Sequence, residues 1–209
     1  MKKALLVLLA LVLICAMMLP LVSCNIFKGE LEFTSNDDGT CYVSGIGSCT
    51  GTDIVVPSVS PDGDSVIGIG DSAFYDCKSL TSITIPSGVT SIGNHAFEDC
   101  TSLTSIEIPD SVTSIGDFAF YDCTNLTSVV IGDSVTSIGI YAFGYCRSLE
   151  SIEIPDSVTS IGDCAFQGCT DLKTVYYAGS EEEWAEISIG IYNAILNDVS
   201  IIYNYVSEE

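Results

Sequence analysis

A 23-residue internal repeat constrains this chain more than any other feature. Three residue types recur at that spacing over five units, in these columns: Phe74, Phe97, Phe120, Phe143 and Phe166; Cys77, Cys100, Cys123, Cys146 and Cys169; Leu80, Leu103, Leu126, Leu149 and Leu172. A unit this short cannot bury its own apolar side chains, so neighbouring units must stack against each other. The repeat therefore predicts a solenoid.

Each unit predicts two extended segments. The apolar spacing L-x-x-I-x-I, as in Leu103, Ile106 and Ile108, matches the L-x-x-L-x-L signature of leucine-rich repeats. Its alternating part predicts a short strand with one buried face, and Pro109 ends that strand at a turn. A second extended segment follows, in which Val112 and Ile115 are expected to point inward.

The rest of the unit is expected to form a short helical turn. Gly116 permits a bend, and Asp117 is placed to cap a turn that carries Phe120 and Cys123. The predicted fold class is an α/β solenoid, mostly β: a right-handed leucine-rich-repeat stack of 23-residue coils with a parallel strand face, seven first strands and short helical turns.

The same spacing locates the two ends of the stack. The segment around Ile54 matches that around Ile83, but 29 residues earlier, because the turn 58–65 adds six residues. Ile201 repeats Tyr177 at a spacing of 24, after a capping-box sequence at 180–183 that opens a helix. We expect an N-terminal cap over 31–53, the solenoid over 54–178 and a C-terminal cap coil over 179–209.

The first 23 residues are predicted to be a secretory signal peptide. Two lysines precede an apolar run over 4–19, and Leu21-Val22-Ser23-Cys24 resembles the lipobox of bacterial lipoproteins, whose cysteine carries the lipid. A lipid on Cys24 and a short tether over 24–30 would keep the exported domain near the outer face of a bacterial membrane. An uncleaved spanning helix is the alternative, which Pro20 disfavours.

The charge of the chain excludes two classes of partner. The chain has 6 Lys and Arg against 28 Asp and Glu; without the two lysines of the leader, 4 − 28 = −24. The basic surface that nucleic acids require is therefore missing, and anionic lipid surfaces would repel the domain.

The repeat unit also carries a family resemblance. The unit I-P-D-S-V-T-S-I-G-D-F-A-F-Y-D-C-T-N-L-T-S resembles the BspA-type leucine-rich repeats of bacterial surface proteins, and the segment Y-Y-A-G-S-E-E-E-W-A-E-I-S-I-G resembles their terminal cap. The resemblance implies adhesion or recognition, since related surface proteins bind matrix proteins such as fibronectin and fibrinogen, or other bacteria. A structural scaffold of the envelope without a host ligand is the alternative, which the short tether favours.

Cysteine is predicted to serve packing in the repeats. Column neighbours point the same way, which is poor geometry for a disulfide, so the column is interpreted as small buried side chains. Cys41 and Cys49 are the best pair for a bridge, and Cys164, at a variable site, is expected to be partly exposed.

The sequence contains no catalytic constellation, so the protein is not expected to be an enzyme. His95 is the only histidine and stands at a variable repeat site, which indicates a surface substitution. Cysteine spacing typical of zinc sites is missing, and neither a metal nor a cofactor is expected. A weaker hypothesis gives calcium to three turn aspartates, Asp110, Asp133 and Asp156.

A surface remains as the candidate site. One outward column of the first strand is nearly uniform in serine, whereas the other varies: Thr84, Glu107, Val130, Glu153 and Tyr176. Solenoids bind partners through such extended faces. The variable column is therefore the predicted binding face for a protein ligand, with a solvated face that binds nothing as the alternative.

Overall fold

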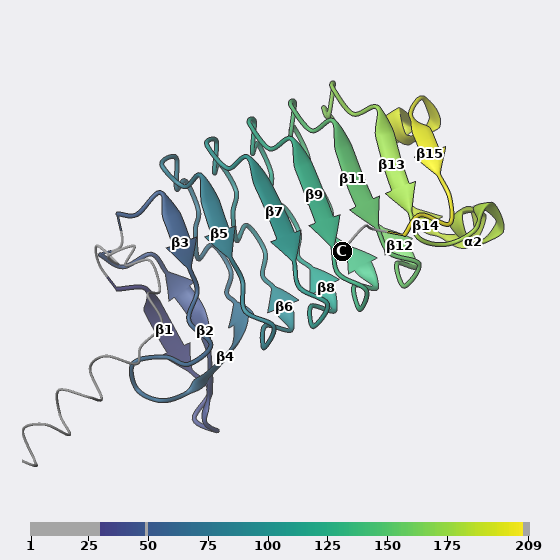
Figure 1. Ribbon diagram of the computed structural model, residues 1–209. Coiled ribbons are helices and arrows are strands. Elements are labelled where there is room, and N and C mark those ends of the chain that lie inside the picture. The colour runs from purple at the N-terminus through teal and green to yellow at the C-terminus, as the bar shows by residue number, and fades with distance from the viewer. Residues whose placement is uncertain (1–29, 49, 207–209) are drawn as a thin grey trace, which may run out of the picture.

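The computed structural model describes residues 30–48 and 50–206, which form a solenoid of stacked coils (Figure 1). The predicted leader, Cys24 and Cys49 lie outside the described residues. Within them, no helix is both long and apolar enough to cross a membrane. The predicted fold class is confirmed: the strands are mostly parallel, and each coil repeats after about 23 residues.

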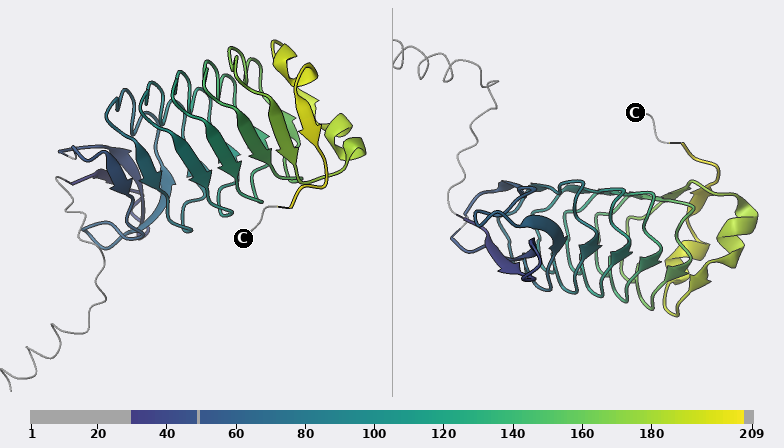
Figure 2. Two further views of the ribbon diagram at one scale, coloured as in Figure 1. Left: turned by 45° about the horizontal axis from the view of Figure 1, so that its top comes forward. Right: turned by 90° about the horizontal axis from the view of Figure 1, so that it is seen from below.

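The first strands of the coils lie side by side along one face of the solenoid (Figure 1 and Figure 2). They are β3 (Asp53–Val55), β5 (Ser82–Thr84), β7 (Ser105–Ile108), β9 (Ser128–Ile131), β11 (Ser151–Ile154), β13 (Thr174–Tyr177) and β15 (Ser200–Ile202). Two of them pair as one sheet and five as another, which gives the seven predicted strands. Ile54 lies opposite Ile83, so the 29-residue spacing at the first coil is correct.

The second sheet has eight strands. They are β1 (Glu32–Ser35), β2 (Thr40–Gly45), β4 (Ser65–Ile69), β6 (Ser91–Ile92), β8 (Ser114–Ile115), β10 (Ser137–Ile138), β12 (Ser160–Ile161) and β14 (Ser188–Ile189). Val112 and Ile115 point inward as predicted. The antiparallel pair of β1 with β2 covers the N-terminal edge of this sheet, which would otherwise present unpaired backbone groups.

The third side of each coil differs from the expected helical turn. Phe118 and Asp122 both have φ in the left-handed region, at 57° and 54°, and this conformation interrupts any helix. The backbone instead bonds to the next coil: the N–H of Phe120 donates to the carbonyl of Ala142 at 2.7 Å. These turns therefore form a third ladder between coils.

Asp117 also has a different role from the predicted one. Its carboxylate accepts the backbone N–H of Ile140 in the next coil at 2.7 Å and does not cap its own turn. Gly116 is needed for close approach, because a Cβ there would lie 2.6 Å from the carbonyl carbon of Gly93. Both residues therefore serve the contact between coils.

Stacked phenylalanines form the centre of the core. Phe120 is fully buried, and its ring lies parallel to those of Phe97 and Phe143, with centroids 5.1 and 5.3 Å away. The same stack continues to Phe74 and Phe166. Inward strand residues complete an apolar interior that runs the length of the solenoid.

The C-terminal cap begins as predicted but ends in a different register. Helix α2 (Glu181–Glu186) opens with the capping box, in which the Ser180 hydroxyl accepts the N–H of Glu183 and the Glu183 carboxylate accepts that of Ser180. After the 3₁₀ helix η1 (Ala194–Asn197), however, Ile201 pairs with Val175 and not with Tyr177. The expected spacing of 24 is thus wrong by two residues, because the cap inserts two helical segments that the repeat lacks.

This cap also explains why the prediction for Cys164 is wrong. Its side chain is only 4% exposed. The cap backbone lies directly against it, since the Cys164 N–H donates to the carbonyl of Ile191 at 2.8 Å. The cap therefore covers this last copy of the variable repeat site.

Candidate binding groove on the strand face

The predicted binding column lies in register across adjacent strands. Val130 in β9 is opposite Glu107 in β7 and Glu153 in β11, and Glu153 is opposite Tyr176 in β13. Successive strand residues point to opposite faces, so the inward neighbours Ile106, Val129, Ile152 and Val175 anchor this column on the core. The sheet thus presents these side chains outward in a line along the solenoid axis.

All five predicted residues line one groove. It encloses about 1240 Å³ and extends from Thr84 in β5 across Glu107, Val130 and Glu153 to Tyr176. The turns after the strands line it as well, through residues such as Pro109, Asp110 and Asp133. The valine is 37% exposed, which leaves an apolar patch between the two glutamates.

The C-terminal segment closes the groove at β13, a feature that the sequence analysis missed. Tyr205 packs on Tyr176 with ring centroids 4.6 Å apart, and its hydroxyl donates to Glu153 at 3.5 Å. Two backbone bonds place it there: the N–H of Asn204 donates to the carbonyl of Gly179, and that of Tyr205 to Tyr177. Only the alternation Tyr203-Asn204-Tyr205 could have suggested a further extended segment.

The groove is acidic. Its lining includes the carboxylates of Glu107, Asp110, Asp133 and Glu153, and no Lys, Arg or His among the described residues contributes to it. Asp110 also has a structural role, because it accepts the N–H of Asp133 at 3.1 Å. In the described part of the chain, no three His, Cys, Asp or Glu side chains are grouped as a metal site. Calcium binding by the turn aspartates stays a prediction.

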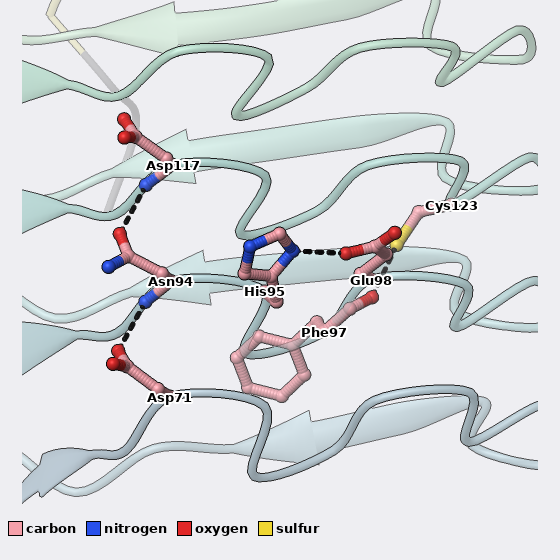
Figure 3. Close-up of polar contacts among 7 residues, drawn as sticks. All are labelled: Asp71, Asn94, His95, Phe97, Glu98, Asp117 and Cys123. Carbon is pink, nitrogen blue, oxygen red and sulfur yellow. Dashed lines mark hydrogen bonds and ion pairs between the residues drawn. The ribbon is translucent and has the colours of Figure 1, made fainter.

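On another side of the solenoid, polar side chains form a ladder between coils (Figure 3). Asp71 accepts the N–H of Asn94 at 2.7 Å, and Asn94 accepts that of Asp117 at 2.8 Å. His95 follows this ladder, contacts Glu98 and stacks on Phe118 at 5.0 Å. Its neighbours are thus a carboxylate and an aromatic ring, as expected for a surface substitution on a repeat.

Four of the five cysteines in the repeat column are buried as predicted, and Cys77 is the exception. The thiol of Cys123 donates to the carbonyl of Phe97 at 3.1 Å (Figure 3), and the same bond recurs at Cys100, Cys146 and Cys169. Burial raises the pKa of the Cys169 thiol to about 12, which keeps it protonated. Cys77 is only half-buried, and a hydrogen bond with the Cys100 thiol lowers its pKa.

The proposed bridge in the N-terminal cap stays a prediction. Cys41 is buried, and its thiol lies 3.8 Å from the carbonyl oxygen of Asp64. Its predicted partner lies outside the described residues.

Comparison with known proteins agrees with this architecture. The BspA type leucine rich repeat region matches residues 64–188 in six copies. The chain belongs to this family.

Two solved structures resemble this BspA-type protein in sequence and fold. A leucine rich repeat protein of T. pallidum is 35% identical over 70% of this chain and 68% of its own, with a TM-score of 0.66. A leucine rich cell surface protein of Faecalibacterium prausnitzii is 33% identical over 76% of this chain and 40% of its own, with a TM-score of 0.69. Among curated proteins, no match was found.

Proposed function

We propose that this protein is an exported surface lipoprotein that recognises a protein ligand through the groove on its strand face. The supporting observation is that the variable outward column of the first strands lines a continuous groove, from Thr84 to Tyr176. Related sequences point the same way, because one similar structure is of a leucine rich cell surface protein. Matrix proteins and the surfaces of other cells are the ligands that this role implies.

Anchoring through Cys24 completes the proposal. The lipobox-like sequence Leu21-Val22-Ser23-Cys24 supports it, and the first described strand begins at Glu32, only eight residues after the cysteine (32 − 24 = 8). The groove would then face its ligand from a short distance above the membrane.

Binding of the full-length chain to immobilised fibronectin and fibrinogen, with and without calcium, tests this function. The triple variant Glu107→Ala/Glu153→Ala/Tyr176→Ala removes the groove contacts, while Asp62→Asn/Asp171→Asn changes two exposed carboxylates that do not line it. We expect saturable binding that the triple variant loses and the control retains. If the chain binds neither fibronectin nor fibrinogen and instead captures a neighbouring envelope protein, the result would identify a structural scaffold.

A further inference from the structure

The groove presents acidic and apolar side chains at regular intervals. Glu107, Val130 and Glu153 lie in register on three consecutive strands. Adjacent strands are about 4.8 Å apart, so the two glutamates are about 9.6 Å apart with the valine midway between them. A ligand along the solenoid axis therefore meets an acid, an apolar side chain and an acid in equal steps.

The charge of the groove determines the charge of its ligand. The described lining contains four carboxylates and no basic side chain. An acidic ligand, or an apolar one without hydrogen-bond donors, would remove water from these carboxylates without offering them a partner, which is unfavourable. Basic side chains on the ligand would compensate that loss, and the chain's net charge of −22 would attract them from a distance.

The interval between these side chains determines the conformation of the ligand. Along an α-helix, residues i, i+3 or i+4, and i+7 share one face and rise in steps of about 5 Å, or about 10.5 Å over seven residues. Along an extended chain, residues on one face are about 6.8 Å apart. The helical interval matches the strand spacing of the groove, and the extended one does not.

We propose that the groove binds a cationic amphipathic helix of a partner protein, laid along the solenoid axis. Lys or Arg at i and i+7 lies over Glu107 and Glu153, and an apolar residue at i+3 or i+4 lies over Val130. This inference rests on the proposed function of the strand face and specifies the partner's chemistry.

The closed end of the groove limits the footprint of the helix. Tyr176 continues the register by one strand, about 14.4 Å from Glu107. A residue at i+10, about 15 Å along the helix, lies over it, and an apolar side chain there completes the pattern. Tyr205 borders the groove at this end, because it packs on Tyr176 and its hydroxyl reaches Glu153, so the footprint covers three turns from β7 to β13.

A synthetic helical peptide with Lys at i and i+7 and Leu at i+3 and i+10 tests the proposal. Its control has the same composition, but both Lys are moved, to i+2 and i+5, on the opposite face of the helix. Fluorescence anisotropy with the full-length chain gives the Kd of each peptide at low and at physiological salt. We expect the patterned peptide to bind about tenfold more tightly, as two exposed ion pairs allow.

Two double variants assign the effect to the groove. Glu107→Gln/Glu153→Gln should weaken the patterned peptide about tenfold, to the level of the control peptide. Asp62→Asn/Asp171→Asn changes the net charge equally outside the groove and should leave both values unchanged. Equal binding of the two peptides, or equal loss in the two variants, would overturn the proposal.

The experiments distinguish failure of the helix proposal from failure of the proposed function. If the triple alanine variant loses fibronectin or fibrinogen binding while the peptides do not discriminate, the face binds a ligand that is not such a helix. If the patterned peptide binds and the matrix proteins do not, the groove binds a cationic helix as proposed, but the partner that carries it is not a matrix protein. Binding of none of them rejects both proposals.

Discussion

Replacing Phe120 by alanine tests the energetic basis of the stack. The ring is fully buried between two parallel rings, with centroids 5.1 and 5.3 Å away. Phe→Ala substitutions in cores cost about 3–5 kcal/mol, and the cost is highest where the cavity cannot collapse. Backbone bonds of 2.7 Å link the coil to both neighbours here, at Phe97 to Ala119 and at Phe120 to Ala142. We therefore expect a loss of about 4–5 kcal/mol in the free energy of unfolding.

Phe118→Ala is the matched control, since it removes the same atoms from the same coil. Phe118 is only half-buried, on the outside of the turn between His95 and Tyr141. It hides less apolar area from water, so its loss should cost less than half as much. Urea unfolding followed by circular dichroism measures the loss of stability in both variants. Equal losses in the two variants, or an unchanged midpoint for Phe120→Ala, would refute the assignment of the phenylalanine column to the core.

Three further predictions concern the polar ladder, the anchor and the thiols. Ile140 is 41% exposed and occupies a position where other coils have Asp or Asn. In Ile140→Asn, the new side chain should accept the N–H of Asp163 and raise the free energy of unfolding by about 1 kcal/mol. Thermal melts measure this change, and a lower stability of the variant would contradict the prediction. Cys24→Ser should move the protein from the membrane fraction to the soluble fraction in immunoblots, whereas retention would indicate a spanning leader. In native protein, maleimide should label Cys77 well before the four buried cysteines of its column, and the difference should vanish in denaturant; uniform native labelling would contradict the packing described here.

The repeat predicted the coil because its spacing reports a physical necessity. Inward columns such as Phe120 and Ile106 must match their neighbours above and below, so their periodicity is visible in one sequence. The third side of the coil was misread because Asp117 suits a helix cap and a ladder equally well. Left-handed φ at a residue such as Phe118 has no sequence signal, since only the next coil's carbonyls favour it.

The groove was predictable only in part. Alternation along the strands identified the outward column, and its lack of uniformity identified the variable residues. The wall at β13 was not predictable, because the position of Tyr205 depends on backbone bonds to residues 177 and 179. The two-residue error in the register of the last coil has the same origin: caps do not obey the repeat, so nothing in its spacing describes them.

Some exposed side chains in this fold are constrained because they form hydrogen bonds between coils. An exposed threonine immediately precedes each of four consecutive strands of the second sheet, and its hydroxyl donates to a carbonyl of the preceding coil at 3.0–3.2 Å: Thr90, Thr113, Thr136 and Thr159. The groove column is different, since Val130 stands in its middle and has no polar group with which to join two coils. Folding therefore requires no particular residue in that column. Of its two carboxylates, Glu153 accepts the Tyr205 hydroxyl at 3.5 Å, and under the proposed function both carboxylates, at equal distance from an apolar centre, contact a ligand.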